Sequence, residues 1–233
     1  MQKNIYKEKV LVVCSGGLDS VSMALRYIGK AEVTLMSFYY GQKAAKEMSV
    51  VKDLANKYEH CEAIFIDIAP LKNIFGKANQ LTNEEVQVEE GYKPSVVVPL
   101  RNAMFLQVAM IYAYTNGFDK VVLGSHLDDC VPQPDGEYAF PDCSPEFFKA
   151  YEMAMDLGTF RKDKKVVIET ASRLGLHKTD LIKYAAVKDP DILSQTWSCY
   201  NNGEHQCGVC DSCRNRKTAF KAAGVEDRTE YEE

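Results

Sequence analysis

The sequence predicts an α/β protein whose sheet is open, doubly wound and built from parallel strands. Short apolar runs of strand length alternate with longer segments of helical period, which is the pattern of βαβ units. The runs are almost continuously apolar, as expected for strands that are covered on both faces. A chain of 233 residues is long enough for one sizeable core with a small appendage.

The expected elements follow one another from the N-terminal end. A buried strand over residues 10–14 leads directly into a helix over 19–28, with a second strand over 32–38. The apolar spacing after that strand predicts a long helix over 42–58. The remaining expectations are strands over 63–68, 120–124 and 165–169 and helices over 102–114 and from Pro145.

Two long connections separate these elements. Residues 70–98 and 125–144 are irregular, and the second stretch is rich in Pro, Asp and Gly. Loops of such length in a compact domain are usually functional or disordered. The second one follows a predicted strand directly, and ligands of open α/β sheets bind beyond the carboxyl ends of the strands. We therefore expect residues 125–144 to border the site, and whether 70–98 closes over it stays open.

Charge and composition favour a small-molecule substrate over a nucleic acid. The formal net charge is −5, and no basic run is longer than residues 161–165, whereas proteins that grip phosphate backbones present a basic face. The apolar stretch over 104–114 is too short to span a membrane, and the N-terminus lacks a signal-peptide pattern. Eight cysteines without an export signal are expected to be thiols or metal ligands, so we expect a cytoplasmic protein.

The hexapeptide Ser-Gly-Gly-Leu-Asp-Ser over residues 15–20 joins the first strand to the first helix. Two glycines allow a tight turn that directs N–H groups to one point, and the helix N-terminus adds its unpaired donors. Such a nest suits a diphosphate. The Gly-Lys-Ser/Thr ending of a Walker A loop is missing. The plain alternative is a turn in which Asp19 or Ser20 is an ordinary N-cap.

Four cysteines near the C-terminus have the spacing of a metal site. Cys199, Cys207, Cys210 and Cys213 form a C-x7-C-x2-C-x2-C pattern, in which two tight turns bring thiolates together. Four thiolates with no open position indicate a closed structural zinc site. An iron–sulfur cluster, a redox Cys-x-x-Cys pair and His205 as a rival fourth ligand remain open.

The phosphate loop resembles the SGGxDS signature of the PP-loop ATP pyrophosphatases. That resemblance implies an adenine nucleotide alpha hydrolase-like fold and a reaction in which an acid attacks the α-phosphorus of ATP, giving an adenylate and pyrophosphate. It also implies that Asp19 assists Mg²⁺ or phosphate and that Ser15 and Ser20 take part in catalysis. The nucleotide-binding residues would be Val13, Cys14, Ser15, Gly16, Gly17, Leu18, Asp19, Ser20 and Arg101.

Further motifs resemble the QueC family of 7-cyano-7-deazaguanine synthases over about residues 10–220. They are Tyr40-Gly-Gln42, Pro99-Leu-Arg-Asn102, Tyr138-Ala-Phe-Pro-Asp-Cys143, and Ser198-Cys-Tyr200 with the three later cysteines. The resemblance implies that 7-carboxy-7-deazaguanine is adenylated, converted to an amide by ammonia, then activated again and dehydrated to a nitrile. It also implies ATP and Mg²⁺ as requirements, one structural Zn²⁺ per chain, and a homodimer.

The same resemblance implies roles for several other residues. Lys178 matches a family lysine near the phosphates, and Arg101 suits a phosphate or carboxylate. Each also has a plain alternative, as an exposed helix residue or a helix-start cation. The substrate contacts would be Tyr40, Gln42, Asn102, Asp142 and Cys143. Asp142 would accept from the guanine-like edge, or else serve as a loop turn or helix cap.

The resemblance divides the chain into three parts. Residues 1–190 would form the PP-loop ATP-binding domain, and 191–225 a zinc-binding segment packed on it. Residues 226–233 are acidic and are expected to fray. The loop histidines His126 and His177 are expected to carry no chemistry.

The divergence from the family lies in the substrate loop. Family members usually read Gln-Arg-His where this chain has Gln42-Lys-Ala44, and they have an arginine where Ser144 stands. A serine cannot pair with an acidic group as that arginine could. Two alternatives follow: a QueC-like enzyme that stops at the amide or transfers the acyl group to an acceptor such as a protein, and a zinc-containing PP-loop enzyme that modifies tRNA.

Overall fold

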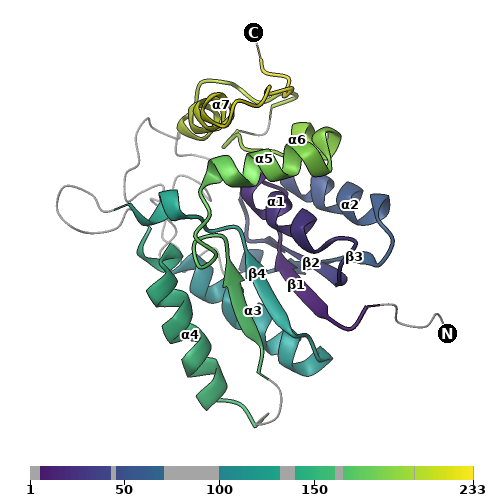
Figure 1. The fold of residues 1–233 in the computed structure, drawn as a ribbon, viewed down its shortest axis with the longest axis vertical. Helices are drawn as coiled ribbons and strands as arrows, with labels where there is room; N and C mark the ends of the chain where they lie inside the picture. The colour runs from purple at the N-terminus through teal and green to yellow at the C-terminus, as the bar shows by residue number, and fades with distance from the viewer. Residues whose placement is uncertain are drawn as a thin grey trace.

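The computed structural model describes residues 6–42, 46–70, 100–131, 140–160, 165–201 and 203–232. Five strands form one parallel sheet in the order β3-β2-β1-β4-β5 (Figure 1). The fold class predicted from the alternating apolar runs is therefore confirmed. The strands are β1 (Lys9–Val13), β2 (Glu32–Tyr39), β3 (Cys61–Asp67), β4 (Lys120–Leu123) and β5 (Val167–Thr170).

The central strand β1 is covered on both faces because its side chains alternate between two cores. Val12 pairs in register with Leu35 of β2 and with Val122 of β4, and all three belong to one apolar cluster. Leu11 points to the opposite cluster. The near-continuous apolar run of β1 thus reflects burial on both sides.

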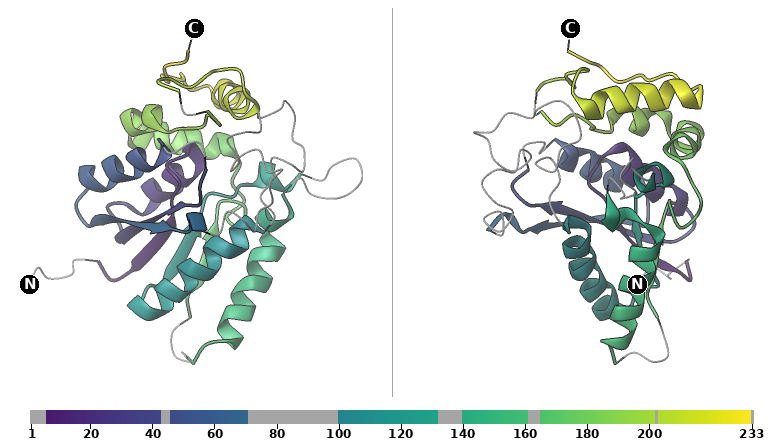
Figure 2. Two further views of the ribbon diagram at one scale, coloured as in Figure 1. Left: turned by 180° about the vertical axis from the view of Figure 1, so that it is seen from behind. Right: turned by 90° about the vertical axis from the view of Figure 1, so that its left-hand side faces the viewer.

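Two layers of helices cover the two faces of the sheet (Figure 2). Side chains of α1, α2 and α5 fill the first cluster, and those of α3 and α4 fill the second. The helices are α1 (Leu18–Tyr27), α2 (Glu47–Lys57), α3 (Arg101–Asn116), α4 (Pro145–Leu157), α5 (Lys178–Lys188), α6 (Pro190–Gln195) and α7 (Asp211–Ala223).

Helix α2 begins five residues later than the sequence predicted. Gln42 was expected to open this helix, but its side chain instead bonds the end of β2, accepting from the Tyr40 N–H at 2.8 Å and donating to the Phe38 carbonyl at 3.0 Å. The helical spacing of the apolar residues was read correctly, but the start was wrong because a polar side chain satisfies the backbone there.

The two long connections are described only in part. Residues 71–99 and 132–139, and the basic run over 161–164, lie outside the described residues, so closure of the first loop over the site is not addressed. Around the second gap, the chain forms two short 3₁₀ helices, η3 (Leu127–Cys130) and η4 (Pro141–Cys143). Both pack near the carboxyl ends of β4 and β5, where a site-bordering loop was expected.

The sequence predicted that the acidic C-terminal segment frays. In the structure, residues 226–232 instead make specific contacts with the rest of the protein. Asp227 accepts a hydrogen bond from Tyr231 at 2.6 Å and forms an ion pair with the buried Arg216 at 3.3 Å. The Glu232 N–H donates to the Gln206 carbonyl at 2.9 Å. Arg216 also donates to the carbonyl of Leu193, so one buried guanidinium ties α6, α7 and the tail together.

None of the helices in the described part of the chain is long and apolar enough to cross a membrane.

Candidate functional site

A cavity of about 360 Å³ opens at the carboxyl ends of β1 and β4. These neighbouring strands mark the point where the strand order reverses, which is where open α/β sheets bind ligands. Its lining includes the loop after β1, the ends of β2 and β4, the starts of α2, α3 and α5, the two 3₁₀ helices and the cysteine-rich segment. Of the residues singled out from sequence, Val13, Cys14, Ser15, Gly17, Leu18, Asp19, Ser20, Tyr40, Gln42, Arg101, Asn102, Cys143, Lys178 and Cys199 contribute to the lining.

The phosphate loop is a turn whose two serine hydroxyls hold its backbone. Ser20 Oγ accepts from the Ser15 N–H at 3.2 Å, and Ser15 Oγ accepts from the Gly17 N–H at 3.1 Å. The two hydroxyls are 3.3 Å apart. Gly17 is the N-cap of α1 and makes no side-chain cap bond, so the reading of Asp19 or Ser20 as an ordinary N-cap is wrong. The turn lies at a helix N-terminus and lines the cavity, as an anion site requires.

Glycines permit two close approaches around this loop. Gly16 has φ +96°, and a Cβ atom there would lie 1.9 Å from the carbonyl oxygen of Glu47, so the start of α2 rests directly on the turn. A Cβ at Gly124, just after β4, would lie 2.8 Å from the Ser20 nitrogen. Gly124 was not singled out from the sequence, although a glycine that ends a strand often marks such an approach.

Asp19 and Lys178 form an ion pair at the edge of the cavity. The Lys178 Nζ lies 2.9 Å from Asp19 Oδ2. His126 Nε2 lies 3.7 Å from the other oxygen, Oδ1, which is buried and has no hydrogen-bond partner among the described residues. Burial alone would raise the pKa of Asp19, but Lys178 and His126 hold that pKa well below its ordinary value. Asp19 is thus a carboxylate with one oxygen available to a cation or a donor.

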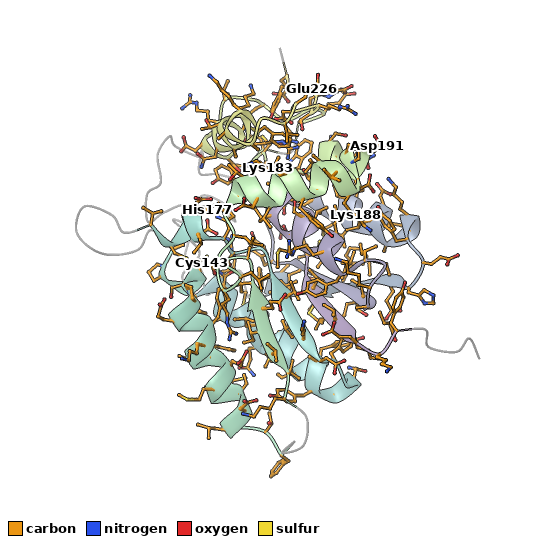
Figure 3. The ribbon with its side chains drawn as sticks, viewed as in Figure 1. Cys143, His177, Lys183, Lys188, Asp191 and Glu226 are labelled. Carbon is orange, nitrogen blue, oxygen red and sulfur yellow. The ribbon has the colours of Figure 1, made fainter. Side chains whose placement is uncertain are left out.

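His126 and His177 contact acidic residues around Lys178, and the expectation that they carry no chemistry stays a prediction. Asp128 in η3 bonds the start of α5 twice, contacting His177 Nδ1 at 2.7 Å and accepting from the Lys178 N–H at 2.8 Å. His126 is 5% exposed and its Nδ1 lies 3.5 Å from Asp129. Figure 3 shows His177 at the beginning of α5, above Cys143. The signal in the sequence that could have indicated these contacts is the pair Asp128-Asp129 directly after His126, because two adjacent carboxylates can contact two different histidines.

Arg101, Tyr40 and Phe105 form the aromatic side of the cavity. Arg101 Nη1 donates to the Tyr40 hydroxyl at 3.2 Å, and its guanidinium lies 5.8 Å from the centre of the Tyr40 ring. Phe105 stacks on Phe38 with ring centroids 4.4 Å apart. Such a surface suits a flat heterocycle, because aromatic rings and guanidinium groups stack on planar rings.

Asp142 does not line the cavity. Its Oδ2 accepts from the Asn102 N–H at 3.2 Å, which caps the start of α3, while Asn102 Nδ2 donates to Cys143 Sγ at 3.3 Å. The helix-cap reading of Asp142 thus matches its place in the structure, although it caps α3 rather than α4. Ser144 is the N-cap of α4, accepting from the Phe147 N–H at 3.2 Å, so its hydroxyl serves the helix.

The four cysteines predicted as metal ligands lie together. All four Sγ atoms are within 4.8 Å of one another, and those of Cys199 and Cys210 are 4.0 Å apart. Tetrahedral zinc with Zn–S bonds of about 2.3 Å places sulfurs roughly 3.8 Å apart, so small movements would close this set on a metal. The Cys207 N–H donates to Cys199 Sγ at 3.4 Å, as suits a thiolate. His205 is not in the group of ligand atoms that lie within 4.8 Å of one another, and its Nδ1 lies 3.4 Å from Glu230 Oε2.

The cysteine knuckle, residues 197–213, forms one wall of the cavity. Trp197, Ser198, Tyr200 and Ser212 line it, and none of them was singled out as a site residue. The Trp197 N–H donates to the Gly16 carbonyl at 3.2 Å, so the knuckle bonds the phosphate loop directly. Lys46 lies over the Trp197 ring at 5.2 Å and donates to the Glu204 carbonyl at 3.0 Å. These contacts join segments nearly 200 residues apart, which sequence spacing cannot reveal.

The fold and this site define an α/β protein of the PP-loop type with a four-cysteine metal-binding knuckle. Comparison with known families matches residues 9–224 to the family described as "Queuosine biosynthesis protein QueC", and the chain belongs to that family. The resemblance drawn from the sequence motifs is confirmed.

Curated relatives carry the description 7-cyano-7-deazaguanine synthase. The protein from Methanoculleus marisnigri is 34% identical over 97% of this chain and 99% of its own length, and that from Nautilia profundicola matches equally well. The relative from Thermoplasma acidophilum is 33% identical over 97% of this chain and 93% of its own. Among solved structures, the U34-tRNA thiolase NcsA from Methanococcus maripaludis with its [4Fe-4S] cluster is 15% identical to this chain. The match covers 94% of this chain and 69% of that one, with a TM-score of 0.46.

Proposed function

We propose that this chain is an ATP-dependent 7-cyano-7-deazaguanine synthase. It attaches AMP to the carboxylate of 7-carboxy-7-deazaguanine, releasing pyrophosphate, and ammonia then displaces AMP to give the amide. A second ATP activates the amide oxygen, and loss of AMP with the remaining N–H protons leaves the nitrile. The curated relatives over nearly the whole chain support this reaction and give no support to transfer onto a protein or to modification of tRNA.

One observation carries the assignment: a single cavity contains both the phosphate loop and an aromatic surface suited to a deazaguanine ring. Ser15, Gly17 and Ser20 line it together with Tyr40 and Phe105, whose ring centroids are 5.6 Å apart. The guanidinium of Arg101 lies 5.8 Å from the centre of the Tyr40 ring. An acid bound on the aromatic side would thus have its carboxylate near the phosphates of a nucleotide in the loop. Holding the two reactants in such proximity accounts for a large share of catalysis in group transfer.

The residues of the chain have separate tasks in this reaction. The loop N–H groups, with the hydroxyls of Ser15 and Ser20, would hold the β- and γ-phosphates by exchanging their internal bonds for phosphate oxygens. Lys178 would stabilise the charge that develops on the departing pyrophosphate. Arg101, with its fixed planar fork, would orient the carboxylate or the α-phosphate.

Two metals belong to the proposal. Mg²⁺, which neutralises phosphate charge when bound, suits the unpartnered Oδ1 of Asp19. Zinc suits the four cysteine sulfurs, because they leave no position open for a reacting ligand. Metal analysis of the purified protein should give about one zinc per chain, with no visible absorption band. A brown protein containing iron and sulfide would replace zinc with an iron–sulfur cluster.

The test of the function is product analysis by mass spectrometry. The protein is incubated with 7-carboxy-7-deazaguanine, ammonium and Mg-ATP, beside the double variant Ser15→Ala/Asp19→Ala. We expect the nitrile from the natural chain and none from the variant. An amide that accumulates without nitrile would limit the reaction to its first half. If AMP is released with other acids but not with 7-carboxy-7-deazaguanine, the assignment of this substrate is wrong.

Two further parts of the proposal concern the setting of the enzyme. We place it in the cytoplasm, where a reducing environment keeps cysteines as thiols or metal ligands. We also propose a homodimer, which light scattering of the purified protein would check. Free ammonia is the nitrogen source in the assay above.

A further inference from the structure

Glu47 is a carboxylic acid placed against the phosphate loop, and the site as described so far gives it no task. It is the first residue of α2 and lines the cavity. Its backbone carbonyl fills the space beside Gly16, and its Oε1 lies 3.9 Å from the Cβ position of Gly17. The backbone of Glu47 thus packs against Gly16, and its side-chain oxygen lies close to Gly17, so both parts of the residue lie beside the phosphate loop.

The carboxyl of Glu47 is not committed to a structural contact in the part of the chain that the structure describes. Among the described residues, no hydrogen bond or ion pair joins this carboxyl to a partner. The other acids near the cavity are engaged: Asp19 pairs with Lys178, Asp129 accepts from the His126 N–H, and Asp142 caps α3. Arg101 lines the same cavity and acts on Glu47 through its charge.

The proposed reaction needs a proton acceptor at this place. Attack of neutral ammonia on the acyl adenylate forms a C–N bond and breaks the bond between the acyl carbon and the AMP oxygen. The nitrogen enters with three hydrogens and the amide keeps two, so one proton must leave. AMP departs with the electron pair of the broken bond. A carboxylate near the acyl carbon accepts the proton as the new bond forms.

We propose that Glu47 is the general base that takes the proton from ammonia when the acyl adenylate is converted to the amide. This inference rests on the proposed function. The side chain lines the same cavity as the phosphate loop and Arg101, and its Oε1 lies 3.9 Å from the Cβ position of Gly17, so an acyl adenylate held by the loop would lie within its reach. Burial raises the pKa of Glu47 to about 8, against the effect of Arg101, and a base near the working pH is the most efficient one.

The two halves of the reaction separate this role from others. Adenylation is followed by exchange of labelled pyrophosphate into ATP, dependent on the deazaguanine acid and measured without ammonia. Amide formation is followed by mass spectrometry with ammonium present. The variants are Glu47→Gln, which keeps the shape of the side chain, and Asp53→Asn, which removes a carboxylate from the exposed face of the same helix.

We expect Glu47→Gln to keep its exchange rate within about threefold while amide formation falls by roughly 100-fold or more. Hydroxylamine, a stronger nucleophile that needs less help from a base, should restore acyl transfer in Glu47→Gln as the hydroxamate. Asp53→Asn should match the natural chain in both assays.

Three outcomes would overturn the inference. Loss of pyrophosphate exchange in Glu47→Gln would assign the residue to binding of Mg²⁺ or of the substrate edge. Amide formation at the natural rate would remove it from the reaction. A natural chain that forms neither amide nor nitrile would overturn the proposed function, and the inference with it, before any variant is compared.

Discussion

The phosphate loop and the cysteine knuckle use the same local device and stabilise it differently. Each is a tight turn at the N-terminus of a helix, α1 or α7, and each contains a glycine with positive φ, Gly16 at +96° or Gly208 at +71°. The loop is anchored by β1 and α1, whose side chains fill a core. The knuckle has a small apolar cluster of Trp197, Cys199 and Cys213. Burial thus holds one wall of the cavity, and we expect four sulfurs, through the metal proposed for them, to hold the other.

Breaking the metal set should have the largest effect. In Cys213→Ser, a buried ligand is lost, and we expect loss of the metal, of several kcal/mol of stability in the knuckle, and of nearly all activity. Metal analysis and proteolysis of residues 197–232 measure this. Cys61→Ser, at the start of β3, serves as the control and should keep its metal. Unchanged metal content in Cys213→Ser would show that the other three cysteines suffice.

Adding a methyl group to the phosphate loop should have the second largest effect. Gly16→Ala would place a methyl group 1.9 Å from a backbone oxygen, so we expect roughly 3 kcal/mol of destabilisation and loss of nucleotide binding. Gly117→Ala is the matched control, because that glycine also has positive φ but no atom within 4 Å of its Cβ position. It should cost about 1 kcal/mol and leave binding intact. Denaturant unfolding and nucleotide titration compare the two, and equal effects would mean that the close approach is not rigid.

Removing a charge without changing either turn should act on rate more strongly than on stability. Lys178→Met is expected to slow pyrophosphate release about 100-fold, because in the proposed reaction the charge stabilises the departing group. Its free energy of unfolding should fall as well, because Asp19 loses its ion-pair partner. Lys183→Met, further along α5 and exposed, is the control (Figure 3). A similar loss in both variants would trace the effect to α5 as a whole.

The smallest expected effect concerns the contact between α6 and the C-terminal end of α2. Asp189 caps α6 and accepts from Lys57 at 2.9 Å and Tyr58 at 2.6 Å on α2. Burial alone would raise the pKa of Asp189, but these donors and the Ile192 N–H hold it below its ordinary 3.8. Its stabilisation is therefore complete above about pH 4 and lost as the pH falls through the lowered pKa. Acid unfolding of Asp189→Asn should show a deficit of about 1 kcal/mol at neutral pH that narrows in acid, and a constant deficit would contradict this.

The sequence carried the local features of both regions and missed the contacts between them. Strand positions, the phosphate loop and the four cysteines follow from periodicity and spacing, which are properties of short segments. The bond from Trp197 to Gly16 and the placement of Glu47 depend on packing between distant segments. The start of α2 was misjudged because Gln42 competes for the backbone, and the tail because Arg216 provides a buried counter-charge for Asp227.

The order in which the walls of the cavity are synthesised has a consequence for the newly made chain. The phosphate loop leaves the ribosome early, but the wall that faces it depends on Cys213, on Arg216 and on the tail that pairs with Gln206. A nascent chain can therefore bury β1 and α1 long before the opposite wall exists. An unfinished chain would have the phosphate loop but not the complete cavity. In the proposed reaction, adenylates, which water destroys, would therefore be made only after translation has passed the knuckle and the proposed metal ion has been captured.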